Sequence, residues 1–276
     1  MLLYRTATTP ILEHNGHWYR IDRAWDEMLN DDHLYECLDA CIGSYPADDA
    51  LAETVADTLP PSGSQEIWAA GVTYLKSKAA RMDESKDAGG GDFYDRVYDA
   101  TRPEIFFKAN AARTVGNNDW LRLRSDSKWV VPEPELTLVI TSSGKIIGYT
   151  IGNDLSCRDI EGENPLYLPQ AKTFDRCAAV GPAILVAKHH PLPTTEIRMK
   201  ILRDGETIID EVTKLSQMKR GLDELVEFLF QDNAHPSGCF LMTGTGIIPP
   251  DDFSLVEGDT IEIEIDGIGR LVNSVK

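Results

Sequence analysis

The fold of this chain is decided by residues 131–154, which read VPEPELTLVITSSGKIIGYTIGND. Apolar and β-branched residues lie on both sides of Ser143-Gly144, a pattern typical of two strands joined by a tight turn. Because side chains along a strand alternate between its faces, Glu133 and Glu135 project on the same side. The stretch therefore predicts a β-hairpin with carboxylates on one face of its first strand, whose other face is apolar: Leu136, Leu138 and Ile140.

The register of the hairpin adds a third carboxylate. If Ser143-Gly144 closes a two-residue turn, Asp154 lies directly opposite Glu133. Opposed residues have Cβ atoms about 5 Å apart, so three carboxylates meet on one face. A turn longer or shorter by one residue would move Asp154 to the other face. Carboxylate oxygens are hard ligands, which predicts a magnesium site, with manganese or calcium as alternatives.

A second interpretation of Glu133 and Glu135 is an acidic face in contact with solvent. Isolated pairs of this kind are common, whereas the opposed Asp154 and the apolar surroundings favour a metal site. Pro132 and Pro134 cannot donate backbone hydrogen bonds, so they predict an edge strand, which also suits an open site.

Most of the remaining chain also reads as strands. Asp204-Gly205 and Asp266-Gly267 separate strand-like runs, as hairpin turns do. Residues 216–231 predict one long helix. These patterns lack the βαβ rhythm of a parallel sheet and predict antiparallel or mixed β with a few helices. Residues 83–103 contain three consecutive glycines before an aromatic stretch, and fit either a lid or a plain surface excursion.

The clearest break in the chain is LPPSGSQ, residues 59–65, with two prolines and a glycine. Before it, short strand-like pieces alternate with helical patterns. The predicted class is α+β, with a small N-terminal α+β domain over residues 1–62 and a larger domain over residues 63–276.

Charge and composition exclude several function classes. The chain has 276 residues with 45 acidic and 27 basic side chains, giving a net charge of -18. Such a surface repels polyanions, so nucleic acid and anionic membranes are not expected partners. High-salt adaptation would produce the same balance. The start lacks a signal sequence, no apolar run approaches the ~20 residues that span a bilayer, and a cytoplasmic protein is predicted. The five scattered cysteines are expected to be free thiols.

Four motifs, taken in order along the chain, resemble the fumarylacetoacetate hydrolase family. They are VPEPELTLVI (131–140), GYTIGNDLSCRDIE (148–161), YLPQAKTFDRCAAVGP (167–182) and LMTGTGI (241–247). The resemblance covers roughly residues 66–276. Further stretches are similar to the sugar-acid branch of that family, the 2-keto-3-deoxy-D-arabinonate dehydratases: GVTYLKSKAARMDES (71–85), YDRVYDATRPEIFFKANAARTVG (94–116), RSDSKWVVPEPEL (124–136) and ENPLYLPQ (163–170).

The resemblance implies a mixed β-roll catalytic domain behind a small N-terminal domain. It also implies a magnesium site whose ligands are the same three carboxylates that strand parity brings together: Glu133, Glu135 and Asp154. Further, it implies that Lys172 is an active-site lysine, that Thr245 binds the substrate carboxylate and that Glu104 is a catalytic glutamate. A homodimer or homotetramer is expected on the same ground.

The implied activity is dehydration of 2-keto-3-deoxy-D-arabinonate, which is the same compound as 2-keto-3-deoxy-D-xylonate, to 2-oxoglutarate semialdehyde. A 2-keto acid can chelate a hard cation through a carboxylate oxygen and its keto oxygen. Lys172 is then the candidate proton acceptor at C3, or a cation holding the enolate. Glu104 is the candidate acid for the departing C4 hydroxyl. Without the resemblance, Lys172 reads as a salt-bridge partner of Asp175 or a surface amine, and Glu104 as a surface carboxylate. Arg158 and Asp159 are expected to form a structural ion pair near the site rather than to act as catalysts.

One position departs from the family pattern. Hydrolases of the family usually carry a catalytic histidine where this chain has Ser77. An acylpyruvate-type hydrolase is therefore less favoured, whereas an oxaloacetate-type decarboxylase, which needs mainly the metal, stays open. A non-catalytic binding protein of the same fold is a further alternative.

Overall fold

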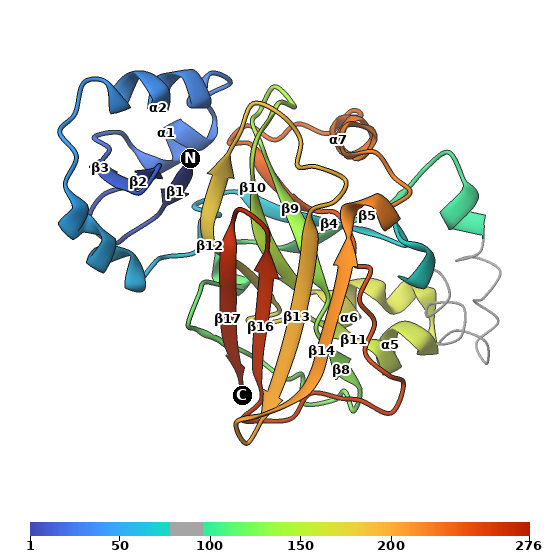
Figure 1. Cartoon of the computed structure of the whole chain (residues 1–276). Helices are drawn as coiled ribbons and strands as arrows, with labels where there is room; N and C mark the ends of the chain where they lie inside the picture. The colour runs from blue at the N-terminus through green and yellow to red at the C-terminus, as the bar shows by residue number, and fades with distance from the viewer. Residues whose placement is uncertain (78–95) are drawn as a thin grey trace.

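Two β-sheets packed face to face form the centre of the molecule (Figure 1). The structure, a computed structural model, describes residues 1–77 and 96–276. The stretch 83–103, read as either a lid or a surface excursion, therefore falls largely outside the described residues. The two sheets confirm the expected mixed β architecture with few helices.

The larger sheet contains both parallel and antiparallel neighbours. In spatial order its strands are β3 (His17–Arg20), β2 (Ile11–His14), β1 (Leu2–Tyr4), β12 (Ala178–Val186), β10 (Ile146–Asp154), β9 (Pro134–Ile140), β15 (Cys239–Met242), β4 (Glu66–Gly71) and β5 (Glu104–Ala109), with β6 (Thr114–Val115) paired to β12. β15 runs parallel to β4, and β6 runs parallel to β12. The other pairs are antiparallel.

The smaller sheet is antiparallel except at one edge, where β7 runs parallel to β17. Its order is β14 (Glu206–Lys214), β13 (Glu196–Arg203), β16 (Thr260–Ile265), β17 (Gly269–Val275) and β7 (Trp120–Leu121), while β8 (Val130–Val131) pairs separately with β11 (Ser156–Cys157). The predicted turn at Asp204-Gly205 joins β13 to β14. Both of its residues have positive φ, which is the requirement that favours Asp-Gly at such turns.

The helices are short and lie around the sheets. They are α1 (Trp25–Leu29), α2 (Leu34–Ile42), α5 (Arg158–Glu163), α6 (Leu168–Lys172) and α7 (Leu222–Phe230), with 3-10 turns η1 (Asp49–Ala56), η2 (Ala111–Arg113), η3 (Pro165–Tyr167) and η4 (Leu215–Gln217). The helix predicted over residues 216–231 is wrong at its start. The chain is extended at Gly221, where Glu224 caps the first turn, so α7 begins at Leu222. Among the described residues, no helix is long and apolar enough to cross a membrane.

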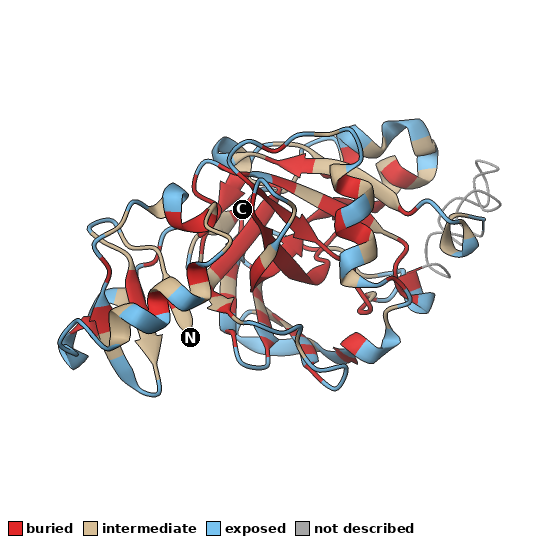
Figure 2. Ribbon diagram, turned by 90° about the horizontal axis from the view of Figure 1, so that it is seen from above, coloured by how far each residue is buried: buried red, intermediate tan, exposed pale blue. Residues whose placement is uncertain are grey.

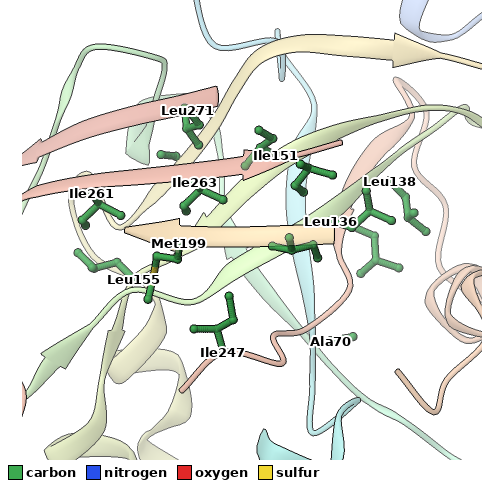
Figure 3. Packing of buried hydrophobic residues seen from close by; sticks show 14 of the residues in the cluster. Ala70, Leu136, Leu138, Ile151, Leu155, Met199, Ile247, Ile261, Ile263 and Leu271 are labelled. Atoms are coloured by element: carbon green, nitrogen blue, oxygen red, sulfur yellow. The ribbon is translucent and has the colours of Figure 1, made fainter. Parts of the chain in front are cut away.

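The main core lies between the two sheets (Figure 3). From the larger sheet, β9 contributes Leu136 and Leu138 and β10 contributes Ile151. The smaller sheet contributes Ile263 and Leu271, and none of these side chains exposes more than 1% of its surface. The apolar face that alternation predicted for the first hairpin strand is therefore the face that packs on the other sheet.

The N-terminal segment packs on the opposite face of the larger sheet. Its strands β1 to β3 continue that sheet beyond β12. Met28 of α1 and Leu38 of α2 belong to a second buried cluster with Val139, Phe240 and Met242 of the central strands. Figure 2 shows buried positions running from the sheet layers into this segment. The domain boundary at residues 62/63 stays a prediction, since the segment shares a sheet and a core with the rest.

The predicted register of the β9–β10 hairpin is confirmed, although its turn is not. Thr141 pairs with Lys145 through the bonds Thr141 N to Lys145 O (2.9 Å) and Gly144 N to Thr141 O (3.0 Å), so the loop is one residue longer than predicted. A β-bulge between Ile146 and Gly148 then shifts the pairing by one residue, so that the strands pair in the predicted register beyond it. As a result the Asp154 N–H donates to the Glu133 carbonyl at 3.0 Å.

The edge position predicted for this strand is wrong. β9 is hydrogen-bonded to β10 on one side and to β15 on the other, so it is a central strand. Pro132 precedes the strand and Pro134 is its first residue, a place where a missing N–H removes no ladder bond. The carboxylates are consequently buried inside the sheet rather than displayed at its border.

Truncation of Leu271 to alanine is expected to destabilise the fold without changing the site. The side chain is fully buried between the sheets, and removing it leaves a cavity. We expect a loss of about 2–5 kcal/mol in the free energy of unfolding, measured by urea denaturation. Metal binding by the folded variant should be unchanged.

Candidate active site

The candidate site lies where strand ends of the larger sheet meet. Glu135 is near the start of β9, Asp154 ends β10, Gly71 ends β4, and Gly244 follows β15. Lys172, the last residue of α6, reaches the same place. One pocket is lined by Ala70, Gly71, Val72, Ser77, Phe106, Glu133, Glu135, Asp154, Lys172, Gly244 and Thr245. It brings together residues that the sequence predicted from four separate motifs.

The three predicted metal ligands form one buried cluster. Glu133, Glu135 and Asp154 each offer a carboxylate oxygen, and these oxygens lie within 4.8 Å of one another. Their exposed fractions are 5%, 1% and 1%, so the solvated acidic face is excluded. Burial, with the charges of Asp154 and Glu133, raises the pKa of Glu135 well above its usual value. Three desolvated, mutually repelling oxygen donors fit a hard divalent cation.

Lys172 is fully buried against these carboxylates. Its Nζ lies 2.7 Å from Glu133 Oε2, 3.0 Å from Asp154 Oδ2 and 2.5 Å from the Ser156 hydroxyl. The interpretations of Lys172 as a surface amine or a partner of Asp175 are wrong, since Asp175 pairs instead with Arg122 at 3.5 Å. The lysine predicted by resemblance is thus in contact with two of the predicted metal ligands.

Further buried charges surround the cluster, and of these the sequence predicted only Arg158 to lie near the site. Arg158 Nη2 lies 2.6 Å from Glu133 Oε1, and Arg158 Nη1 lies 3.4 Å from Glu161 Oε2. Glu161 Oε1 is also 3.4 Å from Lys172 Nζ. The pairing of Arg158 with Asp159 expected from their adjacency is not what the structure shows. Asp159 accepts hydrogen bonds from the Ser127 hydroxyl and the Lys128 N–H, because neighbours along helix α5 point in different directions.

Lys108 is a third buried cation in contact with this cluster. It lies on β5 in the stretch EIFFKA and exposes none of its surface. Its Nζ is 2.6 Å from Asp154 Oδ1. A lysine directly after three apolar strand residues was a usable signal, because an unpaired ammonium is too costly to bury. Arg158 and Glu161 had a weaker signal, their three-residue spacing on one helix.

The charges of this cluster are close to balanced. Four carboxylates (Glu133, Glu135, Asp154 and Glu161) face three cations (Lys108, Arg158 and Lys172), leaving one negative charge when all are ionised. A divalent cation would make the net charge of these groups positive by one. A singly charged organic acid would then bring it to zero, so the cluster favours a metal ion together with a carboxylate ligand.

Glu104 lies beside the pocket. It pairs with Gly71 across β4 and β5, and a Cβ built on Gly71 would overlap the Glu104 carboxylate. Glycine at position 71 therefore makes the space that this carboxylate occupies, next to the pocket that Gly71 lines. The interpretation of Glu104 as a simple surface carboxylate is not supported, since the side chain is half-buried.

Thr245 and Ser77 also line the pocket. The Thr245 hydroxyl donates to the Ile247 carbonyl (3.2 Å) and accepts from the Ile247 N–H (3.1 Å). Just before it, the Gly244 N–H donates to Glu135 Oε2 at 2.6 Å, which orients that ligand. The Ser77 hydroxyl donates to the Tyr74 carbonyl (2.8 Å) and accepts from the Tyr74 N–H (3.2 Å). Ser77, where the resemblance implies a histidine in a hydrolase, is therefore held by hydrogen bonds to the backbone.

Comparison with known proteins identifies the family. Residues 66–276 match the model described as fumarylacetoacetate (FAA) hydrolase, C-terminal. The chain belongs to the fumarylacetoacetate hydrolase family. This confirms the resemblance carried by the four motifs.

Within this family, named sugar-acid dehydratases are similar to the chain. A probable 2-keto-3-deoxyxylonate dehydratase of Haloferax volcanii is 49% identical over 83% of this chain and 77% of that protein. The 2-dehydro-3-deoxy-D-arabinonate dehydratase of Saccharolobus solfataricus is 42% identical over 78% of this chain and 73% of that protein. A solved structure of 2-keto-3-deoxy-D-arabinonate dehydratase complexed with magnesium and 2,5-dioxopentanoate is 34% identical with a TM-score of 0.83, covering 100% of this chain and 99% of that chain. The predicted fold is confirmed by that likeness.

Proposed function

We propose that this protein is a metal-dependent dehydratase, a carbon–oxygen lyase acting on a 2-keto-3-deoxy sugar acid. The substrate is 2-keto-3-deoxy-D-arabinonate, equivalently 2-keto-3-deoxy-D-xylonate, and the product is 2-oxoglutarate semialdehyde. The observation that carries the proposal is the buried carboxylate triad in contact with Lys172. Relatives with dehydratase names at 49% and 42% identity support it, as does the magnesium complex of the 34% identical enzyme. The bound 2,5-dioxopentanoate in that complex is the semialdehyde itself.

Glu133, Glu135 and Asp154 would hold the metal, and Mg²⁺ suits their oxygen ligands. When bound, the ion supplies Lewis-acid polarisation of the 2-keto group. Arg158 on Glu133 and the Gly244 N–H on Glu135 keep these two carboxylates oriented toward the shared centre. The protein thus fixes the ligands through contacts of its own.

Lys172 is the proposed proton acceptor at C3 of the substrate. Its amine is fully buried beside the triad, so a keto acid bound there would present its C3 hydrogens close to Nζ. The contacts with Glu133, Asp154 and Ser156 restrict the side chain to this position. Loss of a C3 proton prepares the neighbouring C4–O bond for cleavage.

Glu104 is the proposed acid that delivers a proton to the departing C4 hydroxyl, which leaves as water. The unsaturated acid then loses one C–H proton at C5 and the proton of the C5 hydroxyl while C3 and C4 each gain a proton, which gives the semialdehyde, so that only one water is lost overall. Thr245, in the Gly-flanked turn after β15, is the proposed contact for the substrate carboxylate.

Ser77 supports dehydration rather than hydrolysis. A hydrolase needs a base to activate water, and a hydroxyl held by the Tyr74 backbone does not supply one. Oxaloacetate decarboxylation needs mainly the metal and is the enzyme alternative, with non-catalytic binding as the last possibility. We further propose that the enzyme is cytoplasmic, acts in pentose degradation and forms a homodimer or homotetramer.

The direct test is incubation of the purified protein with 2-keto-3-deoxy-D-arabinonate and Mg²⁺, with and without a chelator, followed by mass spectrometry. Loss of one water that the chelator abolishes is the expected result. Unchanged sugar acid alongside consumption of oxaloacetate would replace the proposal by the decarboxylase. Metal binding with no turnover of either acid would favour a binding protein.

Replacing Glu135 with glutamine should remove stabilisation by metal. For the wild type, Mn²⁺ at 100 times its dissociation constant is expected to add about 2.7 kcal/mol to the free energy of unfolding. Because Glu135 is one of three buried ligands, Glu135→Gln should lose this increment in a thermal melt. The exposed Glu206→Gln should keep it, and an equal metal response in both variants would contradict the assigned ligand set.

A further inference from the structure

Lys108 has contacts that none of the proposed catalytic steps uses. Its Nζ forms an ion pair with Asp154 Oδ1 at 2.6 Å and donates hydrogen bonds to the carbonyls of Leu155 (2.8 Å) and Lys172 (2.5 Å). The side chain is completely buried. Lys108 is not among the residues that line the pocket, whereas Lys172 is. Lys108 is therefore not placed to act as a catalytic residue.

These contacts join three parts of the chain at one nitrogen. Lys108 comes from β5, Asp154 and Leu155 come from the end of β10, and Lys172 ends α6. The ion pair holds Asp154 Oδ1, which leaves Oδ2 on the side of Lys172 Nζ, 3.0 Å away. The bond to the Lys172 carbonyl fixes the backbone from which the Lys172 side chain extends. The same ammonium thus orients a metal ligand and the proposed proton acceptor.

We propose that Lys108 is a positioning residue that fixes Asp154 for metal binding and α6 for Lys172. The first part rests on the acidic triad alone, whereas the second rests on the proposed dehydratase function. Removal of such a partner of a metal ligand typically weakens metal affinity by about 10- to 100-fold.

The sign of the effect on metal affinity separates positioning from simple charge. If Lys108 acted only through its positive charge, Lys108→Met would leave the cluster more negative and Mn²⁺ would bind more tightly. Positioning predicts weaker binding in Lys108→Met. It also predicts weaker binding in Lys108→Arg, which keeps the charge but places it on a planar fork that cannot reproduce three contacts at one nitrogen.

The experiment is a titration of each folded protein with Mn²⁺, followed by electron paramagnetic resonance. We expect dissociation constants raised about 10-fold or more in both variants. Leu271→Ala is the matched control, because it lowers stability without contacting Asp154 and should leave the dissociation constant within about twofold of the wild type. Unchanged or tighter binding in either variant would overturn the proposal. Failure of both to fold would also overturn it, since Lys108 would then serve folding rather than the site.

A second readout addresses Lys172. At saturating metal and 2-keto-3-deoxy-D-arabinonate, Lys108→Arg should lower kcat about 10-fold or more while KM changes little. If the wild type does not turn this acid over, the proposed function fails but the Mn²⁺ titration still decides the role of Lys108 toward Asp154.

Discussion

Replacement of Lys172 by methionine is expected to lower kcat for 2-keto-3-deoxy-D-arabinonate by about 10²- to 10⁴-fold, the range for loss of a positioned proton-transfer group. Methionine fills a similar volume but cannot take a proton from C3. Because Lys172 Nζ contacts Glu133 and Asp154, removing its charge should leave metal affinity intact or increased. Steady-state kinetics at saturating metal, together with a Mn²⁺ titration, measure the two effects separately.

Lys172→Arg distinguishes the two roles considered for this residue. A guanidinium keeps the positive charge but does not accept a proton in proteins. If Lys172 only holds a developing negative charge, Lys172→Arg should recover much of the activity that Lys172→Met loses. Proton acceptance predicts that both variants are inactive. Lys188→Met, which changes an exposed lysine two residues after β12, should behave as wild type, and an equal loss there would mean that the assay does not report the site.

The hairpin shows what alternation alone can predict. Period-two spacing placed Glu133 and Glu135 together, and the register that puts Asp154 opposite them is the one observed. The loop is nevertheless a residue longer than a two-residue turn, and a bulge at Ile147 compensates for it. A sequence pattern cannot predict a bulge in the middle of an apolar run, because the run has the same pattern with or without the bulge. The prediction succeeded because two local departures cancel.

Long-range packing explains why the sequence did not predict the central position of β9 or the contacts of Lys108 and Arg158. The edge strand predicted from Pro134 was wrong because the argument assumed that a residue without an N–H must lie in an edge strand. Instead, the strand begins at that residue. Lys108 reaches Asp154 across 46 positions of sequence, and no local spacing encodes that contact. The motif containing Arg158 was read correctly as close to the site, but Arg158 pairs with Glu133 and Glu161 rather than with its sequence neighbour.

Replacement of Glu104 by glutamine is the second change expected to have a large effect. Glutamine is nearly isosteric and should fit the space above Gly71, but its amide cannot protonate the departing C4 hydroxyl. We expect kcat to fall by about 10²- to 10⁴-fold with little change in Mn²⁺ affinity, since Glu104 is not among the triad oxygens. The decrease in kcat should be largest for substrates with a C4 hydroxyl. The rate of water loss at saturating metal measures it.

Gly71→Ala provides the geometric counterpart to Glu104→Gln. The added methyl group would overlap the Glu104 carboxylate and force it away from its place beside the pocket. If Glu104 acts as the acid from that place, Gly71→Ala should reproduce most of the kinetic defect while leaving Glu104 chemically intact. Adding Glu104→Gln to Gly71→Ala should then cost little more, because both changes remove the same proton delivery. Fully additive losses would mean that Gly71 affects the pocket by another route and that Glu104 is not the acid.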